Sequence, residues 1–156
     1  MRLIAHRGNT DGVKLELENT PEYIFNALSS GFDVEIDVWG VEGELWLGHD
    51  KPQHKMIDLF NHFNYIADDR IWYHCKNLES ITILNKQSGD AANFFWHQKD
   101  DFTLTSNGHI WTYPNKPITK NSICVLPEIG NYTEKELKCC YGICSDNIVK
   151  YNLYNI

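Results

Sequence analysis

The stretch Phe32-Asp-Val-Glu-Ile-Asp-Val-Trp39 decides how this chain is expected to fold. Apolar residues alternate with acidic ones along it, which is the period of a β-strand. Glu35 and Asp37 therefore share one face, and the valine and isoleucine side chains share the other. Two carboxylates on one face of a buried strand are costly unless a cation or a basic side chain lies beside them. The sequence thus predicts a buried strand that carries a charged site.

Strands and helices alternate on both sides of this strand through the first half of the chain. A short apolar run at 2–6 predicts a strand, and the next helix begins at Thr20-Pro21-Glu22, where threonine caps and proline occupies the first turn. Gly31 is placed to end that helix. The elements expected next are a return strand at 45–47, a helix through 56–63, a strand at 70–76, a helix at 78–89 and a strand at 93–97.

The second half of the chain loses this alternation. Residues 102–113 have the pattern of a β-hairpin with Asn107-Gly108 as its turn. A strand at 122–127, a short helix that opens with the capping box Thr133-Glu-Lys-Glu136, and a last strand at 141–145 complete the series. Because the later strands are separated by so few residues, hairpins and loops are expected in place of outer helices.

Chain length limits the architecture that these elements can build. The 156 residues suffice for one domain with a real core, since 42% of them are hydrophobic. A full (β/α)₈ barrel needs at least about 200 residues. We therefore predict that residues 1–156 form a single α/β domain, a reduced and distorted TIM-type barrel with about seven to eight strands and several outer helices missing.

Charge and hydropathy exclude several classes of protein. The chain has 21 acidic and 14 basic residues and a net charge of −7, which argues against a nucleic-acid partner because phosphate backbones are bound through lysine and arginine. No stretch approaches the roughly eighteen apolar residues of a membrane span, and the N-terminus lacks the pattern of a signal peptide. A cytoplasmic protein without a membrane span is expected.

The cysteine content also favours a cytoplasmic protein. Five cysteines without a CxxC pair are typical of a reducing compartment rather than of a disulfide framework. Cys124, Cys139, Cys140 and Cys144 are spaced too irregularly for an ordinary zinc site, so buried free thiols are the preferred interpretation.

Four short motifs follow one another in the first fifty residues, namely His6-Arg7-Gly8, Glu18-Asn19-Thr20, Glu35-Ile36-Asp37 and Gly48-His49-Asp50. Together they supply two histidines, an arginine and a carboxylate pair. These groups suit the cleavage of a phosphodiester with a divalent metal, because arginine and metal hold anionic oxygens while histidines move protons.

The ordered set resembles the N-terminal pattern of the glycerophosphodiester phosphodiesterase family, within the phospholipase-C-like phosphodiesterases. The resemblance covers the first third of the chain, and Tyr141-Gly-Ile-Cys-Ser-Asp146 looks like the closing strand of the family's barrel. It implies a TIM barrel, a divalent metal, most readily Mg²⁺ or Ca²⁺, and hydrolysis of a small glycerophosphodiester-like substrate. It also implies that a hydroxyl of the substrate is the nucleophile, giving a cyclic phosphate that water then opens.

The resemblance also implies roles for the histidines and the carboxylates. His6 and His49 match the family's general acid/base pair, and surface histidines are the alternative. Glu35 and Asp37 match the metal ligands, and ion pairs with basic side chains are the alternative. The family's third ligand is a glutamate two residues before a lysine, and His74 stands in that place. Imidazole would shift the preference towards Mn²⁺ or Zn²⁺, whereas a satisfied core histidine is an equally good interpretation.

The remaining candidate site residues are expected to bind the phosphate of the substrate or to line its pocket. Arg7 offers a planar fork of donors to phosphate oxygens, and Glu18 is expected to orient Arg7 or the metal shell. Lys76 either neutralises phosphate charge or pairs with the carboxylates. Trp111, Glu128, His97 and Asp146 lie at or near predicted strand ends, where barrel active sites are built. Trp111 and Glu128 are candidate pocket-lining residues, with core packing as the alternative for the tryptophan.

The sequence therefore predicts a metal-dependent phosphodiesterase. A phospholipase-D-like lyase that only cyclises its substrate is an alternative within the same chemistry. A non-catalytic binding module on a degenerate barrel is an alternative of another class, because fold resemblance alone does not fix function.

Overall fold

The computed structural model describes residues 1–60, 68–88 and 91–155. In these ranges the strands join into one ten-stranded sheet. The parallel strands of the sheet are β1 (Arg2–His6), β2 (Asp33–Val41), β5 (Ile71–Cys75), β6 (Asn93–Trp96), β8 (Ile110–Thr112), β9 (Ser122–Val125) and β10 (Gly142–Ser145).

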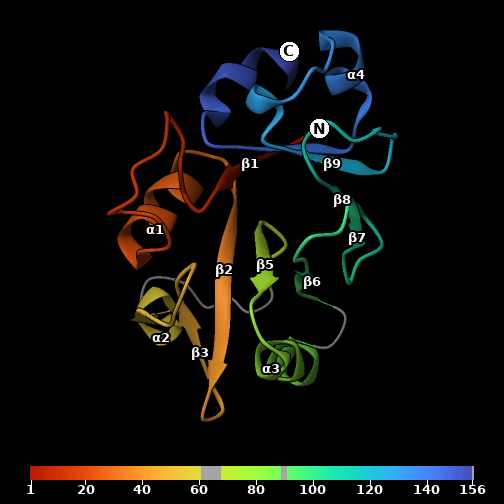
Figure 1. The fold of residues 1–156 in the computed structure, drawn as a ribbon. Helices are drawn as coiled ribbons and strands as arrows, with labels where there is room; N and C mark the ends of the chain where they lie inside the picture. Colours follow the sequence, from red (N-terminus) through yellow and green to blue (C-terminus); the bar gives the residue numbers. More distant parts are fainter. Residues whose placement is uncertain (61–67, 89–90, 156) are drawn as a thin grey trace.

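Strand β2 is the longest strand of the sheet and pairs with three others. It lies parallel to β1 over its first residues and parallel to β5 from Val34 to Val38. Beyond the end of β1 it pairs antiparallel with β3 (Glu44–Leu47), which pairs in turn with the short β4 (His54–Lys55). The predicted strand and return strand are confirmed, and β2 forms the long vertical arrow in Figure 1.

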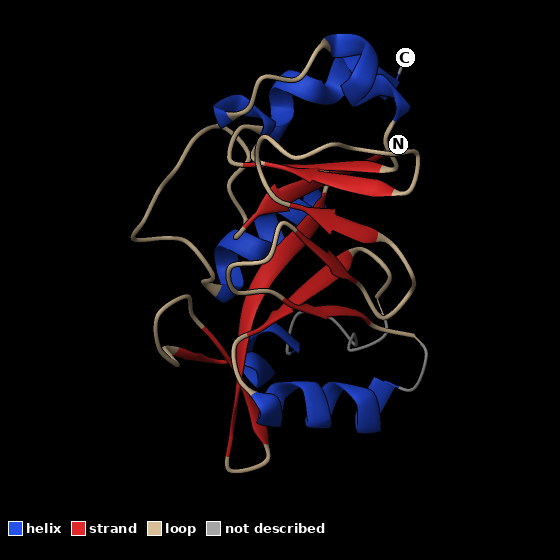
Figure 2. Cartoon of the chain, turned by 45° about the vertical axis from the view of Figure 1, so that its right-hand side comes forward, coloured by secondary structure: helices blue, strands red, loops and turns tan. Residues whose placement is uncertain are grey.

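The sheet curls so that its two ends approach each other (Figure 2). Its parallel strands follow the order β6-β5-β2-β1-β10-β9-β8, and β7 (Phe102–Leu104) lies antiparallel beside β8. After β7 the chain reaches β6, where the backbone N–H of Ser106 donates to the carbonyl of Phe94 at 2.8 Å. The hydroxyl of Thr103 donates to the carbonyl of Trp96 at 2.8 Å. The predicted mixed α/β fold around a curved sheet is therefore confirmed in outline.

Helices cover only part of the outer face. Figure 1 shows α1 (Pro21–Ser29) and α2 (Met56–Phe60) on one flank, α3 (Leu78–Ser88) below, and α4 (Glu134–Cys139) above with the 3-10 segment η2 (Ile148–Asn155). A shorter 3-10 segment, η1 (Pro127–Ile129), follows β9. Within the described ranges no helix lies between β6 and β9, as the sequence predicts. None of the described helices is long and apolar enough to cross a membrane.

Two helix starts follow the predicted capping chemistry. The side chain of Thr20 accepts a hydrogen bond from the backbone N–H of Tyr23, and Pro21 occupies the first turn of α1. At α4 the Thr133 and Glu136 side chains each bond the other's backbone N–H, which satisfies two donors that the helix leaves unpaired. Phe63 and Gly89, with which the sequence extends α2 and α3, lie outside the described residues.

The hairpin of β7 and β8 differs from the two-residue turn that Asn107-Gly108 suggests. Its loop runs from residue 105 to 109, and the backbone N–H of Thr105 donates to the carbonyl of His109 at 2.8 Å. Gly108 has a φ of +83°, which a residue without a Cβ adopts at little cost. The glycine therefore ends the turn instead of forming its centre.

The two faces of the sheet form separate hydrophobic clusters. The outer cluster joins Val34, Ile36 and Val38 to the apolar faces of α1 and α3. The inner cluster lies within the curl and consists of Ile4, Trp72, Phe95, Trp111, Ile123, Val125 and Cys144. The alternation read from 32–39 is thus confirmed, because Glu35 and Asp37 are on the face opposite the three apolar residues of β2.

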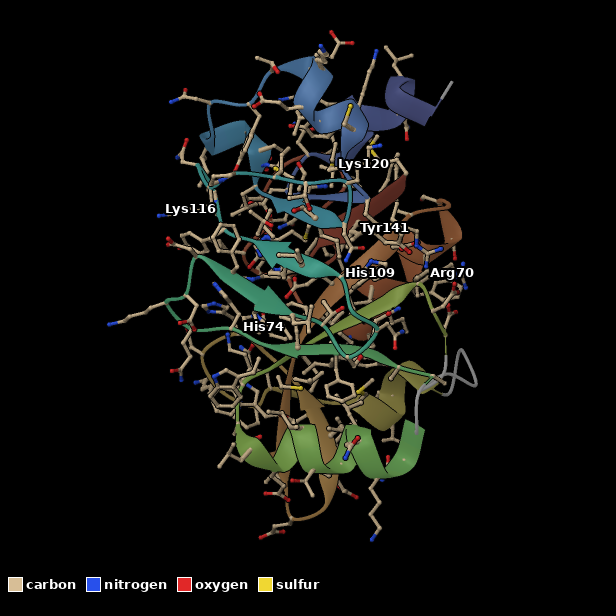
Figure 3. All side chains as sticks on the ribbon, turned by 90° about the vertical axis from the view of Figure 1, so that its right-hand side faces the viewer. Arg70, His74, His109, Lys116, Lys120 and Tyr141 are labelled. Atoms are coloured by element: carbon tan, nitrogen blue, oxygen red, sulfur yellow. The ribbon has the colours of Figure 1, made fainter. Side chains whose placement is uncertain are left out.

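Polar and aromatic side chains fill one end of the curl and close it. Asp33 accepts a hydrogen bond from the indole N–H of Trp72 at 3.0 Å and pairs with Nε of Arg2 at 2.6 Å. Burial raises the pKa of Asp33 to about 6 against the opposing effect of these two partners. The rings of His109 and Tyr141 stack at 3.7 Å at the same end, opposite His74 in Figure 3. The open end of the curl is therefore the other end, where Glu35 and Asp37 of β2 lie.

The cysteines agree with the sequence interpretation except at one position. Cys75, Cys124, Cys140 and Cys144 are buried free thiols. Cys139 is exposed, which corrects the expectation, because it is the last residue of the short helix α4 and faces away from the sheet. In the part of the chain that the structure describes, no cysteine joins a cluster with metal-ligand geometry.

Candidate active site

The candidate site lies at the ends of β1 and β5 and at the middle of β2, which continues beyond them to pair with β3. His6 is the register partner of Glu35 across β1 and β2, and Asp37 is the register partner of His74 across β2 and β5. Because parallel strands end at the same edge of a sheet, these side chains meet on the inner face at the open end of the curl. The nearest ligand atoms of Glu35, Asp37 and His74 lie within 4.8 Å of one another.

Asp37 is fully buried and surrounded by donors. Its Oδ2 lies 3.1 Å from Nε of Arg7 and accepts a hydrogen bond from the Asn19 amide at 2.9 Å. Its Oδ1 lies 3.1 Å from Nζ of Lys76 and 3.0 Å from Nδ1 of His74. Burial alone would raise the pKa of Asp37, but these partners hold it well below its usual range. The ion pairs that the sequence left as an alternative to metal are therefore present at this carboxylate.

Glu35 has a different environment. Its Oε2 accepts a hydrogen bond from the backbone N–H of Arg7 at 3.1 Å, and its Oε1 lies 3.6 Å from Nδ1 of His74. Nε2 of His6 is 3.9 Å away. Among the described residues no lysine or arginine side chain forms an ion pair with Glu35. This carboxylate is the one that is left for a cation.

His74 is held from both sides. Its Nε2 donates to the carbonyl of His97 at 2.9 Å, which directs Nδ1 towards the two carboxylates. Its ring stacks on Phe95 at 5.0 Å. Burial opposes protonation, but Asp37 and Glu35 outweigh it and raise the pKa of His74 to about 9. Both ring nitrogens of His74 therefore have partners, as expected of a core histidine. Its Nδ1 also lies beside the two carboxylates, as expected of a metal ligand.

His6 is oriented by a partner from the other end of the chain. Its Nδ1 donates to Oδ1 of Asp146 at 2.7 Å, which leaves Nε2 on the side of Glu35. Burial lowers the pKa of His6, and the bond to Asp146 together with the charge of Glu35 raises it overall. The amide of Asn9 donates to the same Asp146 oxygen at 2.8 Å. Sequence reasoning noted Asp146 only as a strand-end residue and missed both this role and Asn9.

The loop after β1 reaches this geometry through left-handed backbone. Arg7 has a φ of +53° and Gly8 a φ of +89°, and a Cβ on Gly8 would lie 2.9 Å from the ring of Tyr23. This turn directs both the backbone N–H and the guanidinium of Arg7 at the carboxylates. Nη1 of Arg7 donates to Glu18 at 3.0 Å, as expected of a residue that orients the arginine. Strained backbone of this kind persists where the surroundings fix it.

His49 reaches the site on the loop after β3. The backbone N–H of Gly48 donates to the carbonyl of Asp37 at 3.1 Å, and the indole of Trp39 donates to the Gly48 carbonyl at 2.6 Å. Nδ1 of His49 lies 2.7 Å from Asp50, and the histidine side chain is 42% exposed. His49 is therefore tethered to β2 through its neighbour but lies nearer to solvent than His6.

A cavity of about 400 Å³, the mouth cavity, opens over these groups. It is lined by His6, Arg7, Glu35, His49, His74, Cys75, Lys76, Trp96, His97, Gln98, Trp111, Tyr113, Val125 and Leu126. The structure thus brings together the two histidines, the arginine, the lysine and the tryptophan that the sequence singled out. Asp37 lies beneath Glu35 and His74 rather than in the wall, and Glu18 lines a neighbouring cavity.

Glu128 corrects a sequence expectation, because it does not line the mouth cavity. Leu126 has a left-handed φ of +45°, which turns the chain after β9. The Glu128 carboxylate then accepts hydrogen bonds from the Ser145 hydroxyl at 3.0 Å and from the backbone N–H of Asp146 at 2.9 Å. Glu128 thus holds the end of β10 in place, and thereby also positions Asp146, the hydrogen-bond partner of His6.

The charges at the site fit a divalent cation. Those that meet here, among the described residues, are the carboxylates of Glu18, Glu35, Asp37 and Asp146 and the cations of Arg7 and Lys76. Without a metal, the raised pKa of His74 makes this histidine a further cation at the site. A bound metal would replace its proton, and the site would then keep two negative charges beyond those that Arg7 and Lys76 balance. Carboxylate oxygens and one imidazole nitrogen are ordinary ligands for Mg²⁺, Ca²⁺, Mn²⁺ or Zn²⁺. The donor set therefore fits a metal, with Glu35 and His74 lining the cavity and the fully buried Asp37 behind them.

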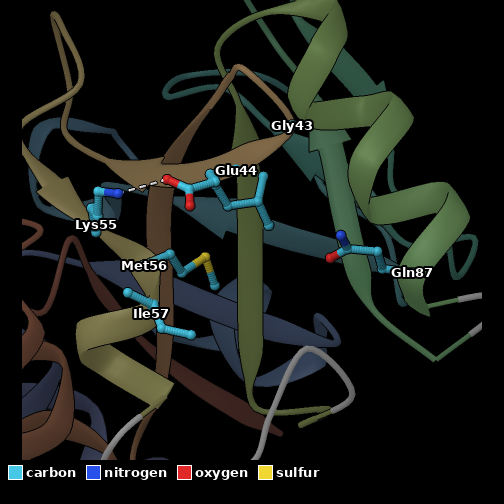
Figure 4. A pocket seen from close by; sticks show the side chains of 7 residues that line it. Gly43, Glu44, Lys55, Met56, Ile57 and Gln87 are labelled. Atoms are coloured by element: carbon cyan, nitrogen blue, oxygen red, sulfur yellow. Dashed lines mark hydrogen bonds and ion pairs between the residues drawn. The ribbon is translucent and has the colours of Figure 1, made fainter.

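A separate cavity of about 220 Å³ lies beside the hairpin of β2 and β3 (Figure 4). Met56, Ile57 and Gln87 line it, and Lys55 pairs with Glu44 at 2.8 Å on its rim. It shares no residue with the mouth cavity and holds none of the candidate catalytic groups.

Comparisons with protein-family models, with curated proteins and with solved structures gave no match.

Proposed function

We propose that this chain is a metal-dependent phosphodiesterase that hydrolyses a small glycerophosphodiester-like substrate on a reduced TIM-type barrel. The observation that carries the proposal is the mouth cavity. His6 and His49 line one cavity with Arg7, although His6 ends β1 and His49 lies on the loop after β3. Glu35 lies in the same wall, 3.9 Å from Nε2 of His6.

Glu35 and His74 would hold the metal, with Asp37 in support. A bound divalent cation supplies Lewis-acid stabilisation of charge on the phosphoryl oxygens. The bond from Nε2 of His74 to the His97 carbonyl fixes the tautomer that offers Nδ1 as a ligand. The imidazole favours Mn²⁺ or Zn²⁺ more than an all-carboxylate site would.

His6 and His49 would move the protons. One imidazole removes the proton of the attacking substrate hydroxyl, and the other protonates the leaving oxygen. Asp146 fixes the orientation of His6 and favours its protonated form, as the carboxylate of a catalytic triad does for its histidine. Asp50 has the corresponding contact with His49 at 2.7 Å, but in a more exposed place.

Arg7 and Lys76 would bind the phosphate. Both side chains are anchored on Asp37, which positions their donors before a substrate arrives. Lys76 therefore meets both sequence interpretations, since it pairs with a carboxylate and lines the mouth cavity. Preorganised cations of this kind stabilise the charge that develops on a phosphoryl group.

A second function is favoured by one observation, the dense set of partners around Asp37. Arg7, Lys76, Asn19 and His74 already satisfy that carboxylate without a metal. A phosphate-binding module that performs no chemistry would need nothing more. The lyase alternative shares every group of the hydrolase and differs only in whether water opens the cyclic product.

The test is a panel of glycerophosphodiesters assayed after chelation and after return of Mg²⁺, Ca²⁺, Mn²⁺ or Zn²⁺. We expect activity that needs a metal and that His6→Ala lowers by at least about 100-fold. His109→Ala is the matched control, because His109 lies at the closed end of the curl and should leave activity unchanged. Full activity in His6→Ala, or none in the wild type with any metal, refutes the phosphodiesterase.

Phosphorus NMR of the same reactions separates the chemical alternatives. A hydrolase gives a phosphomonoester with a transient cyclic intermediate, whereas a lyase stops at the cyclic phosphate. Binding of phosphates without turnover favours the module.

A further inference from the structure

Two cavities meet at the candidate site. The mouth cavity is joined by a side cavity of about 320 Å³, whose lining includes Arg7, Glu18, His49, Asp50, Lys51 and Gln53. Arg7 and His49 line both cavities, so a guanidinium and an imidazole stand at their junction. A phosphate bound at that junction has space on two sides, which suits a diester with two sizeable substituents better than a monoester.

The walls of the mouth cavity differ in chemistry. One side carries His6, Arg7 and Glu35, which come from β1, the loop after it and β2. Strands β6 and β8 are the outermost parallel strands in the order β6-β5-β2-β1-β10-β9-β8, towards the two edges at which the curl closes. The residues that these strands and the loops after them contribute are Trp96, His97, Trp111 and Tyr113, which we call the aromatic wall.

The rings of the aromatic wall are fixed before any ligand binds. Trp111 is buried and stacks on Phe95 at 4.2 Å with an interplanar angle of 26°. Tyr113 stacks on His97 at 5.3 Å with an angle of 28°, and His97 holds His74 through its carbonyl. Tyr113 nevertheless stays 49% exposed, so ring surface is available on the cavity side.

A wall of this composition selects flat rings. Aromatic side chains bind other rings by offset stacking, and preorganised rings lose little conformational entropy in doing so. Val125 and Leu126 add apolar surface beside the wall. The side cavity instead presents Asp50, Lys51 and Gln53, which suit a polar substituent.

We propose that the phosphodiester bound here carries a planar aromatic ring on one substituent, which stacks on Tyr113 and the aromatic wall, while its polar second substituent enters the side cavity. The inference rests on the proposed function, whose substrate class it narrows. Nucleobases and simple aryl groups share this chemistry, and the experiment separates them.

The experiment measures binding of matched phosphates to the full chain by calorimetry, with and without Mn²⁺. Adenosine 5′-monophosphate is compared with ribose 5-phosphate, and phenyl phosphate with cyclohexyl phosphate, so that each pair differs in its aromatic ring alone. We expect the aromatic member of each pair to bind about tenfold more tightly. A preference confined to the adenosine pair identifies a nucleobase as the ring, and a preference in both pairs identifies any aryl group.

Variants at Tyr113 test whether the aromatic wall causes the tighter binding of aromatic phosphates. Tyr113→Leu keeps an apolar side chain of useful size but removes the ring, and should bring both aromatic ligands to the affinity of their partners. Tyr113→Phe keeps the ring and should keep the preference. Ribose 5-phosphate should bind equally to all three proteins, which shows that the phosphate contacts are intact.

Equal affinities within both pairs overturn the inference, as does a preference that persists in Tyr113→Leu. Tighter binding of phosphocholine than of adenosine 5′-monophosphate also overturns it, in favour of a cationic substituent on the rings. Hydrolysis of the glycerol ester of adenosine 5′-monophosphate, whose glycerol hydroxyl lies next to the phosphodiester and can attack it, distinguishes the two proposals. If aromatic phosphates bind more tightly but no diester is hydrolysed, only the proposed phosphodiesterase activity is refuted. If diesters are hydrolysed but aromatic phosphates bind no more tightly than their partners, only the proposed substrate class is refuted. If no phosphate binds at all, both proposals are refuted.

Discussion

Nδ1 of His6 lies 2.7 Å from Oδ1 of Asp146, although 140 positions separate the two residues in the chain. The contact exists because β1 and β10 are parallel neighbours in the sheet, so the residues that follow or end these strands meet at one edge. It raises the pKa of His6 and selects the tautomer whose Nε2 faces Glu35. The last strand thus completes a site whose other parts come mainly from the first half of the chain.

Asp146→Asn should therefore lower kcat/KM by about 100-fold, because the imidazole loses its orienting charge. The pKa of His6, followed by NMR, should fall as well. Asp50→Asn removes a carboxylate at the same 2.7 Å from His49, but Asp50 is 90% exposed where Asp146 is 19% exposed. Solvent screening predicts a small effect there. Equal losses in the two variants would contradict the orienting role of Asp146.

The closed end of the curl gives a prediction about pH and stability. The pKa of Asp33 is about 6 in the folded chain, above its ordinary value of 3.8. Protonation of Asp33 therefore favours folding, and its contribution is complete below about pH 4 and is lost as the pH rises through 6. Relative to Asp33→Asn, the free energy of unfolding of the wild type should fall by about 1–3 kcal/mol across this range. Denaturant titrations of both proteins at several pH values measure the difference. A difference that grows with pH would show that the Arg2 ion pair dominates instead.

Periodicity was enough to predict β2 and its inward carboxylates, because a strand buried on both faces must segregate the two kinds of side chain. The strand predicted at 70–76 is also present as β5, and His74 within it and Lys76 directly after it both contact Asp37. Local capping chemistry likewise predicted the starts of α1 and α4. These features are decided by residues close together in the sequence.

The features that sequence reasoning missed depend on distant contacts or on backbone turns. Asn9 and Asp146 join only when β10 lies beside β1. Glu128 was expected near the pocket from its place after a strand, but the left-handed turn at Leu126 directs it to Ser145. The sequence signal that could have identified Asp146 is its position directly after an apolar final strand, one residue beyond a buried serine.

Gly48 is predicted to be essential for the position of His49. A Cβ at this residue would clash with the carbonyl oxygen of Lys51, and the φ of +144° at Gly48 disfavours any side chain. Gly48→Ala should therefore cost about 2–4 kcal/mol of stability and displace the loop that carries His49. Gly43→Ala is the control, since Gly43 also has a positive φ but no atom within 4 Å of the added Cβ, so only about 1 kcal/mol should be lost. Thermal unfolding and activity of both variants check this. A loss in Gly43→Ala as large as that in Gly48→Ala would argue against the steric explanation.

His74→Glu tests whether the cluster of Glu35, Asp37 and His74 is a metal site. The change places a third carboxylate where Nδ1 of the histidine now lies 3.0 Å from Asp37 and 3.6 Å from Glu35. Without metal, the like charges should lower the free energy of unfolding by about 2–4 kcal/mol. With Mg²⁺ or Ca²⁺, the Tm of His74→Glu should rise more than that of the wild type, because an all-oxygen site suits hard cations. The wild type should instead respond more strongly to Mn²⁺ or Zn²⁺. His74→Gln controls for loss of the imidazole without added charge. If no divalent cation raises the Tm of the wild type or of His74→Glu, the cluster is an ion-pair network and the predicted metal site is wrong.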